Sequence, residues 1–348
     1  MNLQSRRGIK GLALGLALGA GLSFSAPVLA QSMPGKGVTV KPARATWNTG
    51  YFQAQIYIRA LKDLGYSVAA TKELKNEIFY QAVAQGDVDF WVNGWFPLHN
   101  NMKKIFEKGA SIVGYVAKGG ALQGYLVDKK TADRLKIKSL EDFKRPEVKK
   151  AFDSNGDGKA DLVACPPGWG CEKVITFQLD AYDLRKDINP VKAEYSASMA
   201  AAIGRYKTGK SIFFYTWTPN WTVGMLKPGT DVVWIGVPFP ALPKGQKQYE
   251  KDTTVKGVAG CVSDPCKMGW PANDLRPVVN NEFMKKNPAA KKLFEVVRIP
   301  LGDIFAQNAK MQAGENKAAD VERHADEWVA KNRALYDGWL AAARDAAK

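Results

Sequence analysis

Short runs of β-branched and aromatic residues alternate with amphipathic stretches along most of the chain. The runs 38–40 and 66–68 predict strands. Between them, apolar residues recur every four positions and predict one face of a helix that ends at Gly65. The residues of this face are Phe52, Ile56, Ala60 and Leu64. Strands that alternate with helices are typical of an α/β fold.

A helix, a buried strand and a Trp-x-Pro sequence follow one another twice. The first copy consists of a helix over 78–85, a strand over 88–92 and Trp95-Phe96-Pro97. The second copy consists of a helix over 199–207, a strand over 211–215 and Trp217-Thr218-Pro219. Two lobes of like construction would each present a tryptophan just past the carboxyl end of a strand, where open α/β sheets bind ligands. The alternative is a coincidence between two aromatic-rich strand ends.

The length of the chain favours two lobes. Removal of a 30-residue leader from 348 residues leaves about 318, which is more than one hydrophobic core usually supports. Glycines within 119–124 indicate a crossover into the second lobe, and the chain returns within 240–274. We therefore predict a first lobe made of residues 31–121 and 275–348, and a second lobe made of residues 122–274.

The carboxyl-terminal tail, residues 318–347, predicts a helix. Its expected packing residues are Val321, Trp328, Leu335 and Trp339.

The first 30 residues predict an export signal. Three basic residues precede an apolar run over 12–22, and small residues precede a cleavage point near Ala30. The apolar run is too short for a membrane anchor. Its adjacent arginines, Arg6 and Arg7, leave the twin-arginine route open beside the general secretory route. Either route predicts that the mature protein leaves the cytoplasm.

The chain is strongly basic. Its formal net charge of +16 becomes +13 without the leader, because the leader carries three basic residues and no acidic ones. Such a charge can indicate a nucleic-acid-binding protein. Export argues against this class, and the lysines are scattered singly or in pairs along helical stretches. We interpret them as solvated helix faces and predict no nucleic-acid partner.

Four cysteines form two close pairs in the sequence, Cys165–Cys171 and Cys261–Cys266. In an oxidising compartment, pairs at short spacing predict disulfides. Zinc is the rival interpretation. The two histidines, His99 and His324, lie far from both pairs in the sequence, which favours disulfides over a metal site.

No catalytic arrangement is evident in the sequence. With two histidines, no Gly-x-Ser-x-Gly motif, no phosphate-binding loop and no His-Glu-x-x-His motif, nothing supplies a nucleophile with its base. Binding is therefore the stronger hypothesis, and we predict that the protein is not an enzyme.

The sequence "CPPGWGC", residues 165–171, places Trp169 in a short loop that the first predicted disulfide closes. The residues that follow predict a helix, so the amides of Gly170 and Cys171 lie at its amino terminus. Unpaired N–H groups at that position can bind a carboxylate. His99, at the start of another predicted helix, is either a second donor to this carboxylate or a structural histidine.

Three tryptophans, Trp95, Trp169 and Trp217, would then surround a group joined to the carboxylate. A quaternary ammonium fits aromatic walls because it carries a permanent charge, donates no hydrogen bond and is attracted to aromatic faces.

Five segments carry a resemblance to a known family. They are "NGWFPLHNN", "FDSNGDGKADLVACPPGWGCE", "FFYTWTPNW", "LKPGTDVVW" and "KNPAAKKLF". The chain resembles, across essentially its whole mature length, the periplasmic glycine betaine/proline betaine binding proteins of the osmoprotectant ABC importer. The stretch 258–277, which holds the second cysteine pair, departs from the family pattern.

The resemblance implies a two-lobed α/β periplasmic binding protein (type II-like). Each lobe would have a mixed sheet flanked by helices, with the ligand in the cleft between the lobes. The implied partners are a quaternary ammonium solute and an inner-membrane ABC permease with its ATPase, and no cofactor is implied. The residues that match the family's ligand set are Trp95, Trp169 and Trp217 for the aromatic box, and His99, Gly170 and Cys171 for the carboxylate.

The segment "DSNGDGKAD", residues 153–161, has two interpretations. Its residues at calcium-loop positions one, three, five, six and nine are Asp153, Asn155, Asp157, Gly158 and Asp161. Position twelve, which should be a bidentate acid, is Ala164. We take an Asp/Gly-rich turn as the default and calcium binding as the alternative.

Two other functional classes stay open. A secreted enzyme acting on a small cationic substrate would need an acid or base beside the box, and His99 is the candidate that the sequence offers. A surface-binding or matrix-binding protein would use the positive charge, and its binding would depend strongly on salt.

Overall fold

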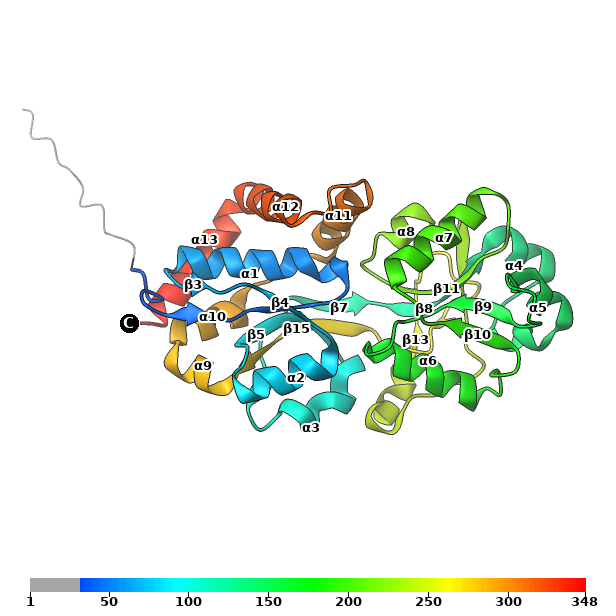
Figure 1. The fold of residues 1–348 in the computed structure, drawn as a ribbon, viewed down its shortest axis with the longest axis horizontal. Coiled ribbons are helices and arrows are strands. Elements are labelled where there is room, and N and C mark those ends of the chain that lie inside the picture. Colours follow the sequence, from blue (N-terminus) through cyan, green and yellow to red (C-terminus); the bar gives the residue numbers. More distant parts are fainter. Residues whose placement is uncertain (1–31) are drawn as a thin grey trace, which may run out of the picture. The chain divides into compact units, whose positions relative to one another are not determined.

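Two β-sheets, each covered by helices, form two lobes that lie side by side (Figure 1). The computed structural model describes residues 32–348, so the predicted leader and its cleavage point near Ala30 lie outside the described residues. No helix in the described range is long and apolar enough to cross a membrane.

The first lobe is built around a long strand, β15 (Asn273–Asn280), which pairs antiparallel with three others. These are β5 (Phe90–Phe96), β6 (Ala110–Ile112) and β7 (Ala117–Ala121). Two short parallel pairs accompany this sheet. They are β1 (Thr39–Val40) with β3 (Ser67–Val68), and β2 (Ala43–Ala45) with β4 (Lys72–Leu74).

Helices from both ends of the chain cover the first lobe (Figure 1). They are α1 (Tyr51–Asp63), α2 (Asn76–Gln85), α3 (Lys103–Phe106), α9 (Asn281–Lys286), α10 (Pro288–Val296), α11 (Leu301–Gln312), α12 (Ala318–Lys331) and α13 (Arg333–Asp345), with the 3₁₀ segments η1 (Asn48–Gly50) and η2 (Leu98–Met102). The predicted apolar face of α1 is confirmed, because all four of its residues are at most 1% exposed.

The second lobe has a five-stranded mixed sheet. Its order is β10 (Ile188–Val191), β9 (Ala160–Val163), β11 (Phe213–Trp217), β8 (Gln123–Asp128) and β12 (Val232–Ile235). Strands β10, β9 and β11 are parallel, whereas β8 is antiparallel to both of its neighbours. Its helices are α4 (Lys129–Leu135), α5 (Pro146–Phe152), α6 (Gly170–Ala181), α7 (Tyr195–Lys207) and α8 (Thr222–Met225), with η3 (Leu140–Lys144).

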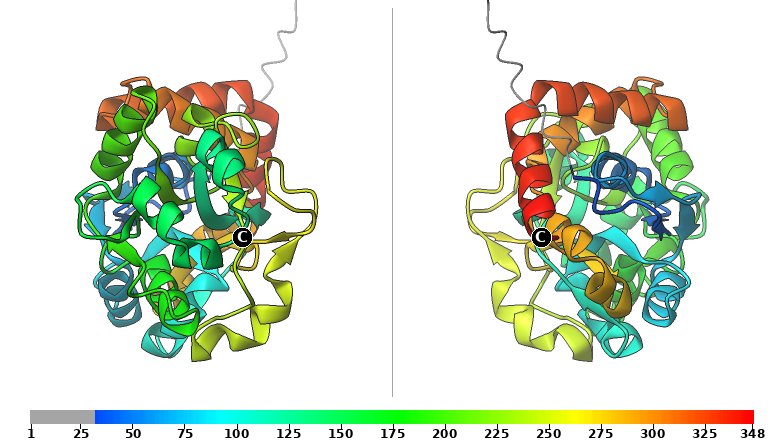
Figure 2. Two further views of the ribbon diagram at one scale, coloured as in Figure 1. Left: turned by 90° about the vertical axis from the view of Figure 1, so that its right-hand side faces the viewer. Right: turned by 90° about the vertical axis from the view of Figure 1, so that its left-hand side faces the viewer.

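The segment between β12 and β15 is mostly irregular and lies along one side of the described residues (yellow in Figure 2). Its short elements are η4 (Lys244–Asp252), β13 (Thr254–Val255) and β14 (Cys266–Lys267). The chain leaves the first sheet at the end of β7 and enters the second at Gln123. The two-lobed α/β prediction is therefore confirmed.

Two predicted strand positions are wrong by a few residues. β5 runs to Phe96 because β15 pairs with it as far as Phe96, so Trp95 lies inside a strand and not past its end. β11 starts at Phe213, since the N–H of Ile212 donates to the Asp128 carboxylate at the strand's edge. β11 runs to Trp217 because β8 pairs with it as far as Gln123, so Trp217 is the last residue of the strand and not past its end. In both Trp-x-Pro sequences the peptide bond before the proline is cis.

The predicted carboxyl-terminal helix is two helices, because the chain breaks at Asn332 between α12 and α13. This break changes the phase of the apolar face, so Leu335 is 44% exposed and its predicted packing role is wrong. Tyr336, which is fully buried, takes its place. The other three predicted packing residues of the tail are buried.

Both predicted disulfides are present. The Cα atoms of Cys165 and Cys171 are 6.0 Å apart, and so are those of Cys261 and Cys266.

Candidate functional site

A cavity between the two lobes is lined by all six residues that the sequence analysis singled out for ligand binding. The space between atoms at this site amounts to about 300 Å³ when the part open to solvent is included. Its lining residues are Trp47, Trp95, Leu98, His99, Gln123, Trp169, Gly170, Cys171, Tyr215 and Trp217. None of these ten is Asp, Glu, Lys or Arg, so the lining offers aromatic faces and neutral hydrogen-bonding groups instead of formal charges.

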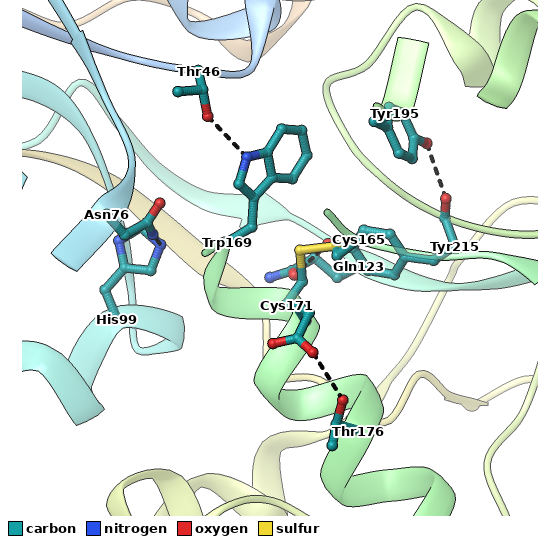
Figure 3. Close-up of a disulfide and its surroundings, with 11 residues drawn as sticks. Thr46, Asn76, His99, Gln123, Cys165, Trp169, Cys171, Thr176, Tyr195 and Tyr215 are labelled. Atoms are coloured by element: carbon teal, nitrogen blue, oxygen red, sulfur yellow. Dashed lines mark hydrogen bonds between the residues drawn. A yellow bond between two sulfur atoms is a disulfide. The ribbon is translucent and has the colours of Figure 1, made fainter. Parts of the chain in front are cut away.

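Trp169 extends from the disulfide-closed loop of the second lobe toward the first lobe. Gly168, just before it, has φ = +92°, a backbone conformation that residues with a side chain rarely adopt. The indole Nε1 of Trp169 donates a hydrogen bond of 2.9 Å to Oγ1 of Thr46 in the first lobe (Figure 3). The indole is only 8% exposed. The loop thus holds Trp169 against the opposite lobe, which explains how so short a loop carries a buried ring.

Aromatic rings from both lobes contact Trp169. Its ring centroid lies 5.3 Å from that of Trp47 and 5.7 Å from that of Trp217, with interplanar angles of 70° and 76°. The Trp217 ring also packs on Tyr195, with centroids 4.8 Å apart. Near-perpendicular rings form walls instead of a stack, so the three indoles enclose a corner.

The amino terminus of α6 faces this corner. The twelve-residue helix begins at Gly170, and no side chain caps its first N–H groups. A Cβ atom at Gly170 would lie 2.9 Å from Cδ2 and 3.2 Å from Nε2 of His99. Only glycine therefore lets the helix terminus come this close to the histidine ring. The amides of Gly170 and Cys171, in the first turn, are available to an anion.

Asn93 orients two of the indoles in the first lobe. Its Oδ1 accepts hydrogen bonds from Nε1 of Trp47 at 2.5 Å and from Nε1 of Trp95 at 3.0 Å. Asn93 is 3% exposed. Because one buried oxygen receives both N–H groups, the two rings are held in fixed positions relative to each other.

His99 is fully enclosed and hydrogen-bonded at both ring nitrogens. The backbone N–H of Trp95 donates to Nδ1 at 3.2 Å, and the Tyr80 hydroxyl lies 2.8 Å from the same atom. A backbone N–H cannot accept, so Nδ1 is unprotonated and the neutral ring carries its proton on Nε2.

The atom nearest to Nε2 is Nδ2 of Asn76, at 2.7 Å (Figure 3). Two N–H groups cannot hydrogen-bond to each other, so a proton on Nε2 requires the Asn76 amide to be turned over, which brings its buried and otherwise unpaired Oδ1 to face the ring. A ligand carboxylate in the cavity would compete with Asn76 for the same proton. Burial also lowers the pKa of His99 to about 3, so the ring is neutral at physiological pH.

Sequence reasoning missed four residues of the lining: Trp47, Leu98, Gln123 and Tyr215. Trp47 follows β2, whose sequence Ala-Arg-Ala has no β-branched residue and gave no strand prediction. Gln123 and Tyr215 reach the cavity through the pairing of β8 with β11, in which Gln123 lies opposite Trp217. Tyr215 could have been found from the sequence, because side chains alternate between the two faces of a strand and Tyr215, two residues before Trp217, shares its face.

The loop 153–161 uses its acidic side chains on its own backbone. The Asp153 carboxylate accepts N–H groups from Gly156, Asp157 and Gly158, and these contacts lower its pKa. The Asp161 carboxylate accepts from Ser154. Within residues 32–348 no group of three or more His, Cys, Asp or Glu side chains is arranged to hold a metal ion.

The sequence model for the substrate-binding domain of ABC-type glycine betaine transport systems matches residues 38–331. The glycine betaine-binding periplasmic protein OusX of Dickeya dadantii is 44% identical over 344 residues, which is 97% of this chain and 98% of that protein. The glycine betaine/proline betaine-binding periplasmic protein of Escherichia coli is 43% identical over 324 residues, 91% of this chain and 93% of that protein.

Solved structures share the fold at lower sequence identity. The structure of lactococcal OpuAC, in a closed conformation with glycine betaine, matches with a TM-score of 0.66 at 22% identity. The match covers 87% of this chain and 99% of the OpuAC chain. An ABC-transporter choline binding protein with choline matches with a TM-score of 0.66 at 18% identity, and the match covers 89% of this chain and 98% of the choline binding protein.

Proposed function

Because the chain belongs to the family of substrate-binding domains of ABC-type glycine betaine transport systems, we propose that it binds glycine betaine or proline betaine and delivers it to an inner-membrane ABC importer. The permease and its ATPase are the protein partners of this function. The family consists of binding domains, which leaves the alternative of a secreted enzyme without support.

One observation carries the proposal: indole rings from both lobes line a cavity without charged side chains, beside an uncapped helix amino terminus. A betaine has a permanent cation that cannot donate a hydrogen bond and a carboxylate that accepts several. The rings match the first group by cation–π attraction, and the helix N–H groups match the second.

We infer that Trp95, Trp169 and Trp217 surround the trimethylammonium group, and that Trp47 forms a further wall. His99 and the amides of Gly170 and Cys171 hold the carboxylate in this arrangement. Their common position in the cavity lining supports these roles. The neutral state of His99 means that it acts as a hydrogen-bond donor through Nε2 and not as a cation.

The cation–π attraction of the three rings is too weak to give micromolar affinity by itself. Each aromatic face contributes roughly 0.5 to 2 kcal/mol, so three faces give about 1.5 to 6 kcal/mol. Micromolar affinity needs about 8 kcal/mol. The remainder must come from the carboxylate contacts and from burial of the methyl groups.

Binding would be coupled to closure of the lobes, which we place at residues 31–121 with 275–348, and 122–274. Several hydrogen bonds join these lobes, and two of them involve residues of the cavity lining, Trp169 and Leu98. Besides Trp169 with Thr46, the Gln246 amide donates to the Leu98 carbonyl at 2.7 Å, and the Asn100 amide donates to the Tyr249 hydroxyl at 2.9 Å. Hinged closure around a ligand would form such contacts together.

We place the protein in the periplasm. Its relatives from Dickeya dadantii and Escherichia coli are periplasmic proteins. Residues 1–30 have the organisation of an export signal, and we propose cleavage near Ala30.

The test is a titration of the purified protein followed by tryptophan fluorescence. Glycine betaine should change the emission, because it enters among the indoles, whereas glycine, which lacks the methyl groups, should not. Equal responses to both ligands would refute the proposed aromatic site. Recovery of unchanged glycine betaine after long incubation distinguishes binding from turnover.

A further inference from the structure

Gln123 occupies a distinctive position in the cavity. It begins β8 and lies directly opposite Trp217 in the antiparallel pairing with β11. Side chains directly opposite each other across an antiparallel pair are close neighbours on the same face of the sheet. Gln123 is 1% exposed and lines the cavity together with Trp169, Gly170 and Cys171. In Figure 3 its side chain runs past the disulfide, with the amide on the side toward His99.

Only the oxygen of the Gln123 side-chain amide has a hydrogen-bond partner among the described residues. Its Oε1 accepts a hydrogen bond of 2.7 Å from the Tyr215 hydroxyl. Its Nε2, although buried, has no hydrogen-bond partner among residues 32–348. Buried polar groups in folded proteins are almost always paired, so an unpaired N–H₂ group in a cavity lining indicates a place for an acceptor.

A second glutamine shows that this arrangement is specific to the cavity. Gln178, also fully buried in the second lobe, accepts a hydrogen bond of 2.7 Å from the Tyr125 hydroxyl. Its Nε2 donates to the carbonyls of Gly269 at 2.8 Å and Ala241 at 3.4 Å. The two Tyr–Gln pairs thus share their oxygen contact, and they differ in that only Gln178 has protein partners for its nitrogen.

The chemistry of the surroundings decides which way the Gln123 amide faces. The Tyr215 hydroxyl can donate or accept, so it does not by itself fix the amide orientation. The cavity lining also contains the backbone N–H groups of Gly170 and Cys171, which are donors that can bind an anion. A carboxylate held by them would attract the N–H₂ side of Gln123 and leave Oε1 on Tyr215, as the structure has it.

We propose that Gln123 is a specificity-determining residue that donates a hydrogen bond to the ligand's carboxylate. It thereby favours a betaine, which has an acidic end, over choline, which ends in a hydroxyl. This inference rests on the proposed function and adds a ligand contact to it. A hydrogen bond to a charged acceptor is stronger than one to a neutral hydroxyl, so the preference follows from the donor alone.

The test compares glycine betaine with choline by calorimetric titration of Gln123→Met, Gln178→Met and the unaltered protein. Methionine matches glutamine in length and lacks its N–H₂ group. Gln123→Met should weaken glycine betaine binding at least about tenfold, or about 1.4 kcal/mol, and choline binding less than threefold. Gln178→Met removes a buried Tyr–Gln pair outside the cavity and should leave the ratio of the two affinities unchanged.

A second variant covers the case in which Gln123→Met does not fold. Gln123→Glu keeps the shape and loses its donor as the introduced acid ionises, so its glycine betaine affinity should fall with rising pH while the unaltered protein's does not. An unchanged betaine-to-choline ratio in whichever variant folds would overturn the role of Gln123 alone. Absence of glycine betaine binding by the unaltered protein would overturn the proposed function as well.

Discussion

The indole Nε1 of Trp169 and the hydroxyl oxygen of Thr46 are joined by a hydrogen bond of 2.9 Å that crosses from one lobe to the other. Trp169 is held by a disulfide-closed loop of the second lobe, and Thr46 follows a strand of the first. A residue of the proposed aromatic box therefore also joins the two lobes. Under the proposed function, ligand contact and lobe closure would meet at this one side chain.

Loss of this bond should shorten the lifetime of the complex. Thr46→Val removes the hydroxyl and keeps the shape, so we expect glycine betaine affinity to fall about 3- to 10-fold, as expected for one neutral hydrogen bond. The change should lie mainly in the dissociation rate, which stopped-flow fluorescence measures. Thr46→Ser retains the acceptor and should restore most of the affinity. Equal dissociation rates for all three proteins would show that the bond has no role in holding the ligand.

Replacement of Gly170 should separate the helix terminus from the histidine. In Gly170→Ala the new Cβ would lie 2.9 Å from the His99 ring, so α6 has to shift. We expect glycine betaine affinity to fall at least about tenfold, or about 1.4 kcal/mol, by calorimetric titration.

Gly204 in α7 supplies the matched control. A Cβ there meets nothing within 4 Å, so Gly204→Ala should leave affinity unchanged and raise the free energy of unfolding by about 0.5 to 1 kcal/mol. An unaffected affinity in Gly170→Ala would exclude close contact between the ligand and this helix terminus.

The two disulfides should differ in their effect on binding. Replacement of Cys165 and Cys171 by serine frees the loop that holds Trp169, so both affinity and stability should fall, the latter by about 2 to 3 kcal/mol. Replacement of Cys261 and Cys266, neither of which lines the cavity, should lower stability alone. Titrations and urea unfolding of the two double variants give the comparison. A similar loss of affinity in both would mean that the first disulfide acts through general stability.

Burial of His99 predicts how the stability of the fold depends on pH. The folded pKa is about 3 and an unfolded histidine titrates near 6.5, so the unfolded state binds more protons between these values. The free energy of unfolding is therefore unaffected by His99 above about pH 6.5, and it decreases as the pH falls from 6.5 toward 3. Between pH 6 and pH 4, the unaltered protein should lose roughly 1 kcal/mol per pH unit more than His99→Gln. Parallel stability profiles from urea unfolding would contradict this burial.

The same pKa predicts that ligand affinity is nearly constant between pH 5.5 and pH 8. His99 is neutral throughout this range, so in the proposed site it would donate through Nε2 without a change of charge. Calorimetric titrations should agree within about twofold. A change of affinity with a midpoint near the ordinary histidine pKa would show that the ring becomes charged in the complex.

The site could be predicted as far as its residues lie in local sequence patterns. The cysteine-bracketed Gly-Trp-Gly and the Trp-x-Pro sequences are short, and the residues they indicated meet in one cavity. Trp47 and Gln123 belong to the same cavity through contacts between distant segments, namely the shared acceptor Asn93 and the strand pair β8–β11. Such contacts depend on strand register and lobe packing, which no local pattern contains.

In the fold, too, features set by local sequence could be predicted and features set by contacts between distant segments could not. The apolar face of α1 was predictable because a helix repeats its pattern within a few turns. The extension of β5 to Phe96 was not, since it depends on pairing with β15, almost two hundred residues further along the chain. Leu335 was assigned to the wrong environment because the break at Asn332 rotates the face of the helix that follows.

The most direct test of the central claim compares glycine betaine with 3,3-dimethylbutanoate, in which carbon replaces the charged nitrogen at the same shape. Both ligands carry the carboxylate and three methyl groups, so their difference in affinity isolates the attraction between the cation and the indoles. The account predicts that 3,3-dimethylbutanoate binds at least about tenfold more weakly, because three aromatic faces at their lower limit of about 0.5 kcal/mol each give about 1.5 kcal/mol. Equal affinities in calorimetric titration would contradict it.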